Sequence, residues 1–286
     1  MAISIGSNIT SVQAQRRLDS TGSKLSQTFN KLSSGYRINR GADDAAGLAI
    51  AESLKAQSRL AGQAIRNTND GISTIAIADG ALGEVGNILT RLAELASQSA
   101  NGTLSTTQRS AVANEFVALG SEIERIAAVT EFNGTKLLSG TSNITIQVGT
   151  GSGASSQIGY NNLLATLQGI GLSNDGSGAL SYSINGATEA AAASAARLAL
   201  DAVYAAIYSV GASRGILGGV ESRLSTAINN LGVARENLLA AESRIRDVDV
   251  AEEAANLTRL NILQQAGAAV LVQANQLPSL ALQLLR

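Results

Sequence analysis

The apolar residues of this chain recur at helical spacing over most of its length, and most regularly near its C-terminal end. Between residues 257 and 286, one position of a seven-residue repeat is mostly small: Leu260, Gly267, Ala274 and Ala281. A second position, three residues later, holds large aliphatic side chains: Leu263, Val270, Leu277 and Leu284. This repeat predicts a helix with a coiled-coil seam, which Pro278 bends or weakens. Other apolar residues flank the seam, so the helix needs neighbours on several sides.

The first 32 residues carry a second amphipathic pattern of similar length. Leu18, Leu25 and Leu32 repeat every seven residues there. This predicts a helix that pairs with the C-terminal one. The glycines and the asparagine that follow indicate a linker over residues 33–42, after which Asp43 or Asp44 caps a new helix.

Three further helices are predicted in the middle of the chain. The first spans 44–100 and keeps its apolar stripe in phase across Asn69-Asp70-Gly71, although that triplet favours a turn. A shorter helix covers 105–129, and the longest begins near Thr188. One heptad position of the longest helix is aliphatic throughout: Val203, Val210, Leu217, Leu224, Leu231, Leu238 and Ile245. Asp247 and Asp249 mark a second linker.

Between these helices the pattern changes to a period of two. Ile144, Ile146 and Val148 alternate with polar residues, and Gln157–Tyr160 follows a glycine- and serine-rich turn. This predicts a β-hairpin within residues 135–160. Residues 161–186 are rich in Gly, Ser and Asn, which favours a surface excursion of loops and short strands.

The predicted fold class is therefore mainly α: a long antiparallel helical bundle with a small β-hairpin, and terminal helices paired in a stalk. We expect a stalk domain from residues 1–42 and 247–286. The bundle domain comprises 43–160 and 187–246, and 161–186 is the excursion.

Composition limits the function. The net charge of −1 gives no basic field for nucleic acid, and the chain has no His and no Cys. The usual base of a catalytic triad and the thiolate ligands of metals are therefore missing, so we expect no enzyme, no metal and no cofactor. The acidic residues near Asp247 lack the spacing of a calcium-binding loop. We also expect no cleavable signal peptide, and no membrane insertion, because Glu189, Arg197 and Asp201 interrupt the apolar run at 187–210.

Several motifs make the sequence resemble the bacterial flagellins. The N-terminal motifs are Leu32-Ser33-Ser34-Gly35, Arg37-Ile38-Asn39, Asp43-Asp44-Ala45-Ala46-Gly47, Asn69-Asp70-Gly71-Ile72-Ser73 and Phe132-Asn133-Gly134. The C-terminal motifs are Ser243-Arg244-Ile245 with Asp247, Ile262-Leu263-Gln264-Gln265-Ala266-Gly267, Gln273-Ala274-Asn275-Gln276 and Leu284-Leu285-Arg286. They cover residues 1–150 and 190–286 in the family's order. The short middle is similar to a flagellin without large outer domains.

The resemblance implies a subunit that polymerises into the extracellular flagellar filament for motility. Its terminal helices would be disordered in the free subunit and would fold on assembly. The seam residues implied to carry assembly are Leu18, Leu25, Leu32, Leu260, Leu263, Val270, Leu277 and Leu284. The implied partners are other copies, the flagellar export apparatus and its chaperone, and the filament cap and hook-junction proteins.

Other interpretations stay open at this stage. The hook–filament junction protein resembles flagellins at both ends, and a signalling coiled coil would suit the long heptad pattern. Flagellins are also recognised by an animal toll-like receptor, through a helix face similar to residues 89–98. The matching residues are Arg91, Leu95 and Glu115, and a neighbouring copy in the filament is the other candidate partner for this face.

Overall fold

The computed structural model describes residues 7–140, 143–160, 163–174 and 178–284, with their side chains up to Gln276. The chain forms two compact units. We call residues 1–58 with 235–286 the terminal unit, and residues 59–234 the bundle unit. The helix breaks lie near the domain boundaries predicted at residues 42 and 247, but the compact units divide within helices, and the predicted domain division stays a prediction.

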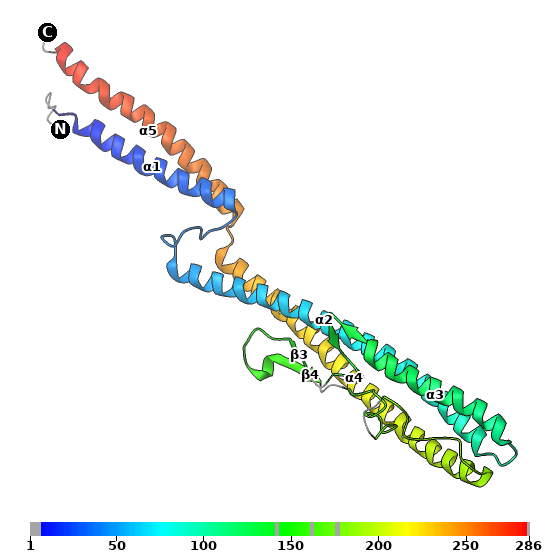
Figure 1. The fold of residues 1–286 in the computed structure, drawn as a ribbon. Coiled ribbons are helices and arrows are strands. Elements are labelled where there is room, and N and C mark those ends of the chain that lie inside the picture. Colours follow the sequence, from blue (N-terminus) through cyan, green and yellow to red (C-terminus); the bar gives the residue numbers. More distant parts are fainter. Residues whose placement is uncertain (1–6, 141–142, 161–162, 175–177, 285–286) are drawn as a thin grey trace. The chain divides into compact units, whose positions relative to one another are not determined.

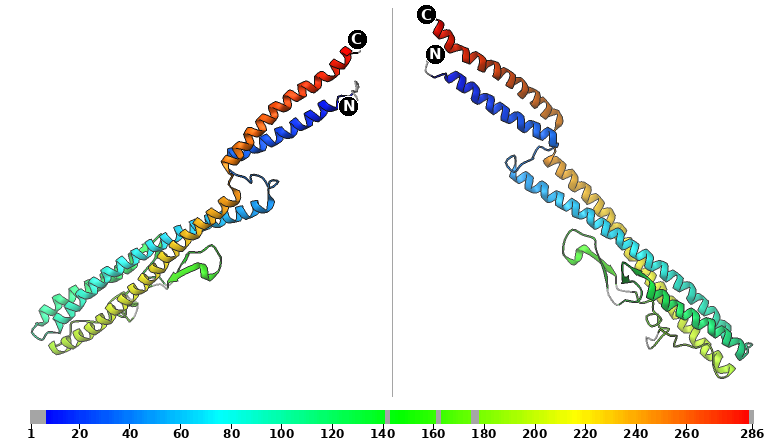
Figure 2. Two further views of the ribbon diagram at one scale, coloured as in Figure 1. Left: turned by 180° about the vertical axis from the view of Figure 1, so that it is seen from behind. Right: turned by 45° about the horizontal axis from the view of Figure 1, so that its top comes forward.

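The terminal unit is built on two antiparallel helices. α1 (Ile9–Ser34) and α5 (Val250–Leu284) lie side by side in each view (Figures 1 and 2). The side of α1 toward α5 is at least half-buried at alternating intervals of three and four residues: Ser11, Ala14, Leu18, Thr21, Leu25, Thr28 and Leu32. This is the spacing of a heptad seam. Four of these seven residues are small or polar, which allows the two backbones to approach closely.

The bundle unit contains most of α2 (Ala45–Ala100), all of α3 (Thr106–Val129) and most of α4 (Glu189–Arg246). The heptad predicted for α4 is confirmed, because Val203, Val210, Leu217 and Leu224 are fully or almost fully buried. Both long helices α2 and α4 are apolar enough by composition to cross a membrane, but core helices of soluble proteins pass the same test. Here their apolar sides form the core of the unit.

The triplet Asn69-Asp70-Gly71 lies inside α2, as the in-phase stripe predicts. Gly71 is buried, and a Cβ at this position would overlap the side chain of Ile146. The Asn67 side-chain amide, one turn earlier, donates to the carbonyl of Gln147 at 3.3 Å. The glycine therefore permits a strand to lie directly against the helix.

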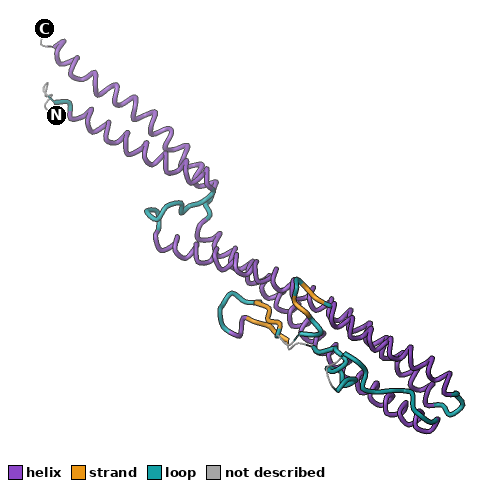
Figure 3. Tube along the Cα trace, in the orientation of Figure 1, coloured by secondary structure: helices purple, strands orange, loops and turns teal. Residues whose placement is uncertain are grey.

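That strand belongs to the predicted hairpin. β3 (Ile144–Gln147) pairs antiparallel with β4 (Gln157–Tyr160), with a 3₁₀ turn at Ala154–Ser156 between them (Figure 3). A second, smaller ribbon, β1 (Glu131–Phe132) and β2 (Thr135–Lys136), follows α3. Its turn is Asn133-Gly134, with φ of 50° and 77°, as a tight hairpin turn requires.

The described part of residues 161–186 differs from the predicted surface excursion with short strands. The described residues 163–174 and 178–188, which we call the strap, contain turns and bends and no strand. Six of their apolar side chains are buried in the core: Leu163, Ala165, Leu167, Ile170, Leu172 and Ile184. Backbone contacts fix the strap as well, since the Ser99 hydroxyl donates to the carbonyl of Ile184 at 2.7 Å. The apolar residues of the strap are few and follow no regular spacing, so no periodicity predicted their burial.

Candidate assembly surfaces

The predicted seam of α5 divides into two groups. Leu260 is buried against α1, and Gly267 lies so close to Leu18 that an added Cβ would be 3.3 Å from its Cδ1 atom. Leu263 and Val270 are 51% and 58% exposed, so they do not pack on α1. The prediction that they face Leu18, Leu25 and Leu32 is therefore corrected for the single chain.

A different set completes the seam of α5. Glu253, Leu257, Leu260, Gly267, Leu271 and Ala274 are at least half-buried. On a helix, apolar residues lie on both sides of the Leu260–Gly267–Ala274 line. The sequence alone does not tell which of these two sides packs on the partner helix. Leu277 and Leu284 lie outside the residues whose side chains are described.

The outward side of the helix pair remains apolar. The exposed large residues on α1 are Ile9, Val12 and Phe29, and those on α5 are Val250, Ile262, Leu263, Val270 and Val272. Ile262, Leu263, Ala266, Ala269 and Val270 lie on one side of α5, at helical spacing. We call these five residues the outer face of α5. An apolar surface of this kind marks a site of association.

The predicted receptor surface is only partly at the surface. Arg91 of α2 is exposed, and its guanidinium donates to Glu94 at 2.8 Å and to Glu115 of α3 at 2.9 and 3.0 Å. The hydrogen bonds to these two carboxylates raise the pKa of Arg91, and the bond to Glu94 has the larger effect. Leu95, however, is 1% exposed and belongs to the core of the bundle. The prediction that Leu95 shares a contact face with Arg91 is wrong, because its position on the helix turns it toward the core.

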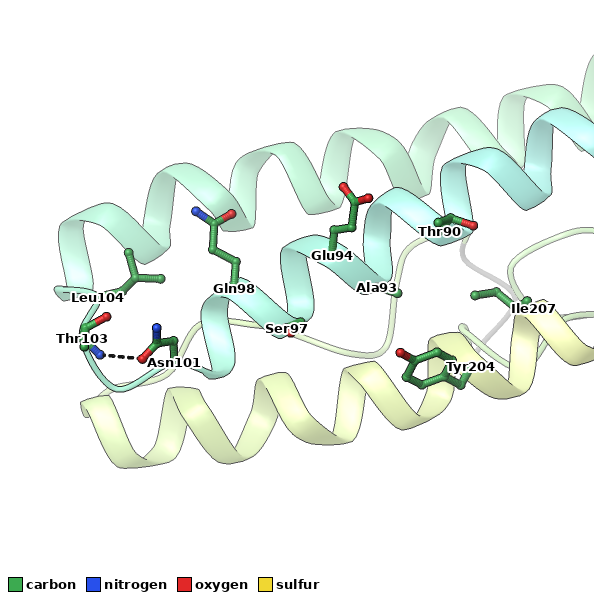
Figure 4. A pocket seen from close by; sticks show the side chains of 10 residues that line it. All are labelled: Thr90, Ala93, Glu94, Ser97, Gln98, Asn101, Thr103, Leu104, Tyr204 and Ile207. Atoms are coloured by element: carbon green, nitrogen blue, oxygen red, sulfur yellow. Dashed lines mark hydrogen bonds between the residues drawn. The ribbon is translucent and has the colours of Figure 1, made fainter.

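An open groove of about 760 Å³ lies beside this surface (Figure 4). Tyr204 and Ile207 of α4 form one side, and α2 with the loop that follows it forms the other. Glu94 and Gln98 extend from α2 away from Tyr204, so the polar groups do not converge on one point (Figure 4). Within the described parts of the chain, no cluster of acidic residues has the arrangement of a metal site.

The sequence patterns gave no sign of one buried and one largely buried arginine. Arg109 of α3 is fully buried and donates to the backbone carbonyls of Asn101 and Glu189, at 2.8 and 3.0 Å. Arg246, at the end of α4, stacks on the ring of Tyr36 at 4.3 Å. Neither residue interrupts an apolar repeat in the sequence, so only its surroundings in the fold identify it.

Linker acids hold the helix starts. The Asp44 carboxylate accepts from the Gly47 amide at 2.9 Å and caps α2, while Asp249 accepts from the Ala251 and Glu252 amides at 2.9 and 3.2 Å at the start of α5. Asp43 instead accepts from the amides of Arg40 and Asn39 at 2.9 and 3.1 Å, which lowers the pKa of its carboxyl. These acids therefore have structural partners, as expected of linker residues.

Comparison with known proteins agrees with the two-ended pattern. The bacterial flagellin N-terminal helical region matches residues 5–143, and the C-terminal helical region matches residues 200–285. Flagellins of Halalkalibacterium halodurans and Bacillus subtilis are each 44% identical to this chain, with 99% of both chains covered. A putative flagellar hook-associated protein from Vibrio parahaemolyticus shares the fold, with a TM-score of 0.57 at 17% identity over 72% of this chain and 99% of that one.

Likeness at 17% identity establishes a common fold and does not favour the junction protein. The mainly α fold class is confirmed by the long packed helices and by this structural neighbour. The near-complete match to flagellins, from the first helix to the last, decides the family. The chain belongs to the bacterial flagellins, a family of structural proteins, and it is a subunit that polymerises into the extracellular flagellar filament for motility.

Proposed function

We propose that the outer face of α5, together with the exposed apolar residues of α1, is the surface through which copies of this flagellin polymerise. The observation that carries this proposal is the exposure of Ile262, Leu263 and Val270 at 51–60% on one side of a paired helix. Burying a large aliphatic side chain contributes about 1.5–3 kcal/mol. A neighbouring copy that covers several of them provides enough free energy for a head-to-tail polymer.

In this proposal the terminal domain, residues 1–42 and 247–286, makes two kinds of contact: within one chain and between copies. Leu18, Leu25, Leu32 and Leu260 hold α1 to α5 inside one chain, while Leu263 and Val270 contact other copies. Leu277 and Leu284 extend the same aliphatic position and are proposed to act in the same way. The bundle domain is proposed to comprise residues 43–160 and 187–246, with 161–186 between them.

The test is a double substitution on the outer face, Ile262→Ser with Val270→Ser. We expect the critical concentration for seeded filament growth to rise at least about tenfold, since a loss of about 1.4 kcal/mol already gives this factor. The matched control is Leu198→Ser with Ile216→Ser, which removes exposed apolar residues from α4, at 64% and 52% exposure. The control should assemble near the wild-type concentration.

Electron microscopy and sedimentation measure the outcome. An unchanged critical concentration for the Ile262/Val270 variant, with wild-type circular dichroism, contradicts the proposal. Equal losses in both variants would assign assembly to apolar surface in general rather than to this face.

Export is the second part of the proposal. We infer that the chain travels unfolded through the flagellar export apparatus with a chaperone, and that it joins the filament beneath a cap protein and beyond the hook-junction proteins. This inference rests on the family resemblance and on the absence of disulfides, since the chain has no Cys.

The surface formed by Arg91, Glu94 and Glu115 is proposed to contact a neighbouring copy, and to be the part of the free subunit that a toll-like receptor recognises. All three side chains are about half exposed, and they are already held in one network. Arg91→Ala should weaken receptor activation in a reporter assay, because it removes the cation of that network. Arg125→Ala, on an exposed ion pair of α3, is the control. Equal activation by the two variants would contradict the receptor assignment.

A further inference from the structure

The two helix breaks of the terminal unit are bonded to each other. One is the linker of residues 35–44 between α1 and α2, and the other is Asp247–Asp249 between α4 and α5. We call the place where they meet the linker joint. All of its residues lie within the terminal unit.

Backbone bonds form the first layer of the joint. The Val248 amide donates to the Gly35 carbonyl at 3.0 Å, and the Arg37 amide donates to the Arg246 carbonyl at 2.7 Å. Tyr36 and Asp247 form an antiparallel bridge between these two bonds. Gly35 has φ of 75° and ends α1, so the chain turns directly from the helix into this short ladder.

Arg37 adds a cap for another helix. The last carbonyls of a helix accept no hydrogen bond from within the helix, so their donors must come from elsewhere. The Arg37 guanidinium donates to the Ile245 carbonyl at 2.7 Å, and its backbone amide serves the Arg246 carbonyl. The first linker thus caps the end of α4, a helix more than 200 positions away in sequence.

Arg246 closes the joint from the side. Its side chain is only 11% exposed, and its guanidinium lies 4.3 Å from the centre of the Tyr36 ring. One nitrogen, Nη1, lies 2.9 Å from Glu52 of α2 and 3.9 Å from Glu242 of α4. The cation therefore contacts the first linker, α2 and α4 at the same time.

The contacts of Arg246 suit a residue that positions its neighbours. Its Nε atom is buried and has no hydrogen-bond partner among the described residues, which costs free energy. A planar cation that stacks on a ring and reaches carboxylates on two helices suits a positioning role, and lysine, whose ammonium is not planar, does not reproduce the stacking on Tyr36.

We propose that Arg246 is the positioning residue of the linker joint and that the joint makes both linkers one rigid connection. In the filament, this connection passes strain between the α1–α5 pair and the adjoining turns of α2 and α4, and so it helps to determine the helical form of the filament. The inference rests on the proposed role of α1 and α5 in assembly, and it adds the residue that controls their attachment.

The test compares Arg246→Lys with Arg244→Lys in filaments of the full chain. Arg244 is exposed in the same last turn of α4, and no ion pair or hydrogen bond of its side chain is present in the described structure. We expect amide hydrogen exchange at Arg37 and Val248 to accelerate about tenfold or more in Arg246→Lys only, because the ladder opens locally. Filament pitch, measured by dark-field microscopy, should change in the same variant.

Three outcomes separate the possibilities. Exchange and pitch equal to those of Arg244→Lys overturn the proposal. Loss of helicity in the bundle unit as well overturns it, because it assigns Arg246 to general stability. If the Arg246→Lys chain folds but does not elongate seeds, Tyr36→Leu decides. Filaments of Tyr36→Leu with altered pitch and faster exchange at Arg37 then support the proposal. The proposed assembly face is judged separately, by the Ile262/Val270 variant.

Discussion

Gly71 shows how one residue reconciles a poor helix sequence with a long helix. Glycine destabilises a helix interior by up to about 1 kcal/mol relative to alanine. At this position it also leaves the space that Ile146 of β3 fills. The fold accepts a locally unfavourable residue because the hairpin packs on it.

Gly71→Ala should lower the free energy of unfolding by about 1–2 kcal/mol. The overpacking cost of about 1–3 kcal/mol exceeds the gain in helix propensity. Gly80→Ala is the control, since nothing lies within 4 Å of a Cβ at that exposed position of the same helix. It should instead raise the free energy of unfolding by about 0.5–1 kcal/mol. Urea unfolding followed by circular dichroism measures both, and equal stabilisation by both changes would contradict the packing role of Gly71.

Charge at single positions follows the same logic. Arg214 of α4 pairs with Asp79 of α2 through two contacts of 2.7 and 3.0 Å. The hydrogen bonds from Arg214 lower the pKa of the Asp79 carboxyl. A group whose pKa is lowered by folding stabilises the fold above its unfolded value of about 3.9, and this contribution is lost as the pH falls through the folded pKa. Both side chains are more than a third exposed, so the pair contributes at most about 1 kcal/mol at neutral pH.

At the scale of elements, α3 and the start of α4 are joined by Arg109 rather than by apolar contacts alone. The two carbonyls that it binds belong to the loop after α2 and to the first residue of α4. A buried cation bonded to neutral carbonyls holds both segments at a fixed distance from α3. The capping box of Ser105 and Gln108 positions the beginning of that helix.

Arg109→Lys keeps the charge in the core but removes the fork that reaches both carbonyls. We expect the free energy of unfolding to fall by about 1.5–3 kcal/mol, the usual contribution of a hydrogen bond to a charged group. Arg125→Lys, on the exposed side of α3, should change it by less than about 0.5 kcal/mol. Thermal unfolding measures the two variants, and a similar effect of both would show that the burial of Arg109 has no energetic importance.

At the scale of the whole molecule, each unit satisfies a different requirement. The bundle unit buries its own core, with Leu82, Leu89, Phe116 and Leu217 almost inaccessible. The terminal unit buries one narrow seam and leaves Phe29, Ile262 and Val270 at the surface. A surface that is not buried within the chain suits a protein whose final state is a polymer. The prediction that the terminal helices fold only on assembly stays a prediction.

The sequence by itself determined the elements and the family. An apolar stripe predicted α2 and a seven-residue repeat predicted α4, each over more than fifty residues, because helix periodicity accumulates with length. Alternation over Ile144, Ile146 and Val148 predicted the hairpin, because successive side chains of a strand point to opposite faces. Motifs at both ends predicted a flagellin, which the relatives confirm.

The tertiary structure alone decided which faces meet. It turned Leu95 into the core, moved Leu263 and Val270 to the surface, and buried apolar side chains of the strap that follow no repeat. It also brought Tyr36 to Arg246 across more than 200 residues. A periodic pattern specifies that a helix has an apolar side, but that side is wider than the strip that one partner helix covers. Only the partner helix selects which part is covered, and long-range pairs leave no local signal in the sequence.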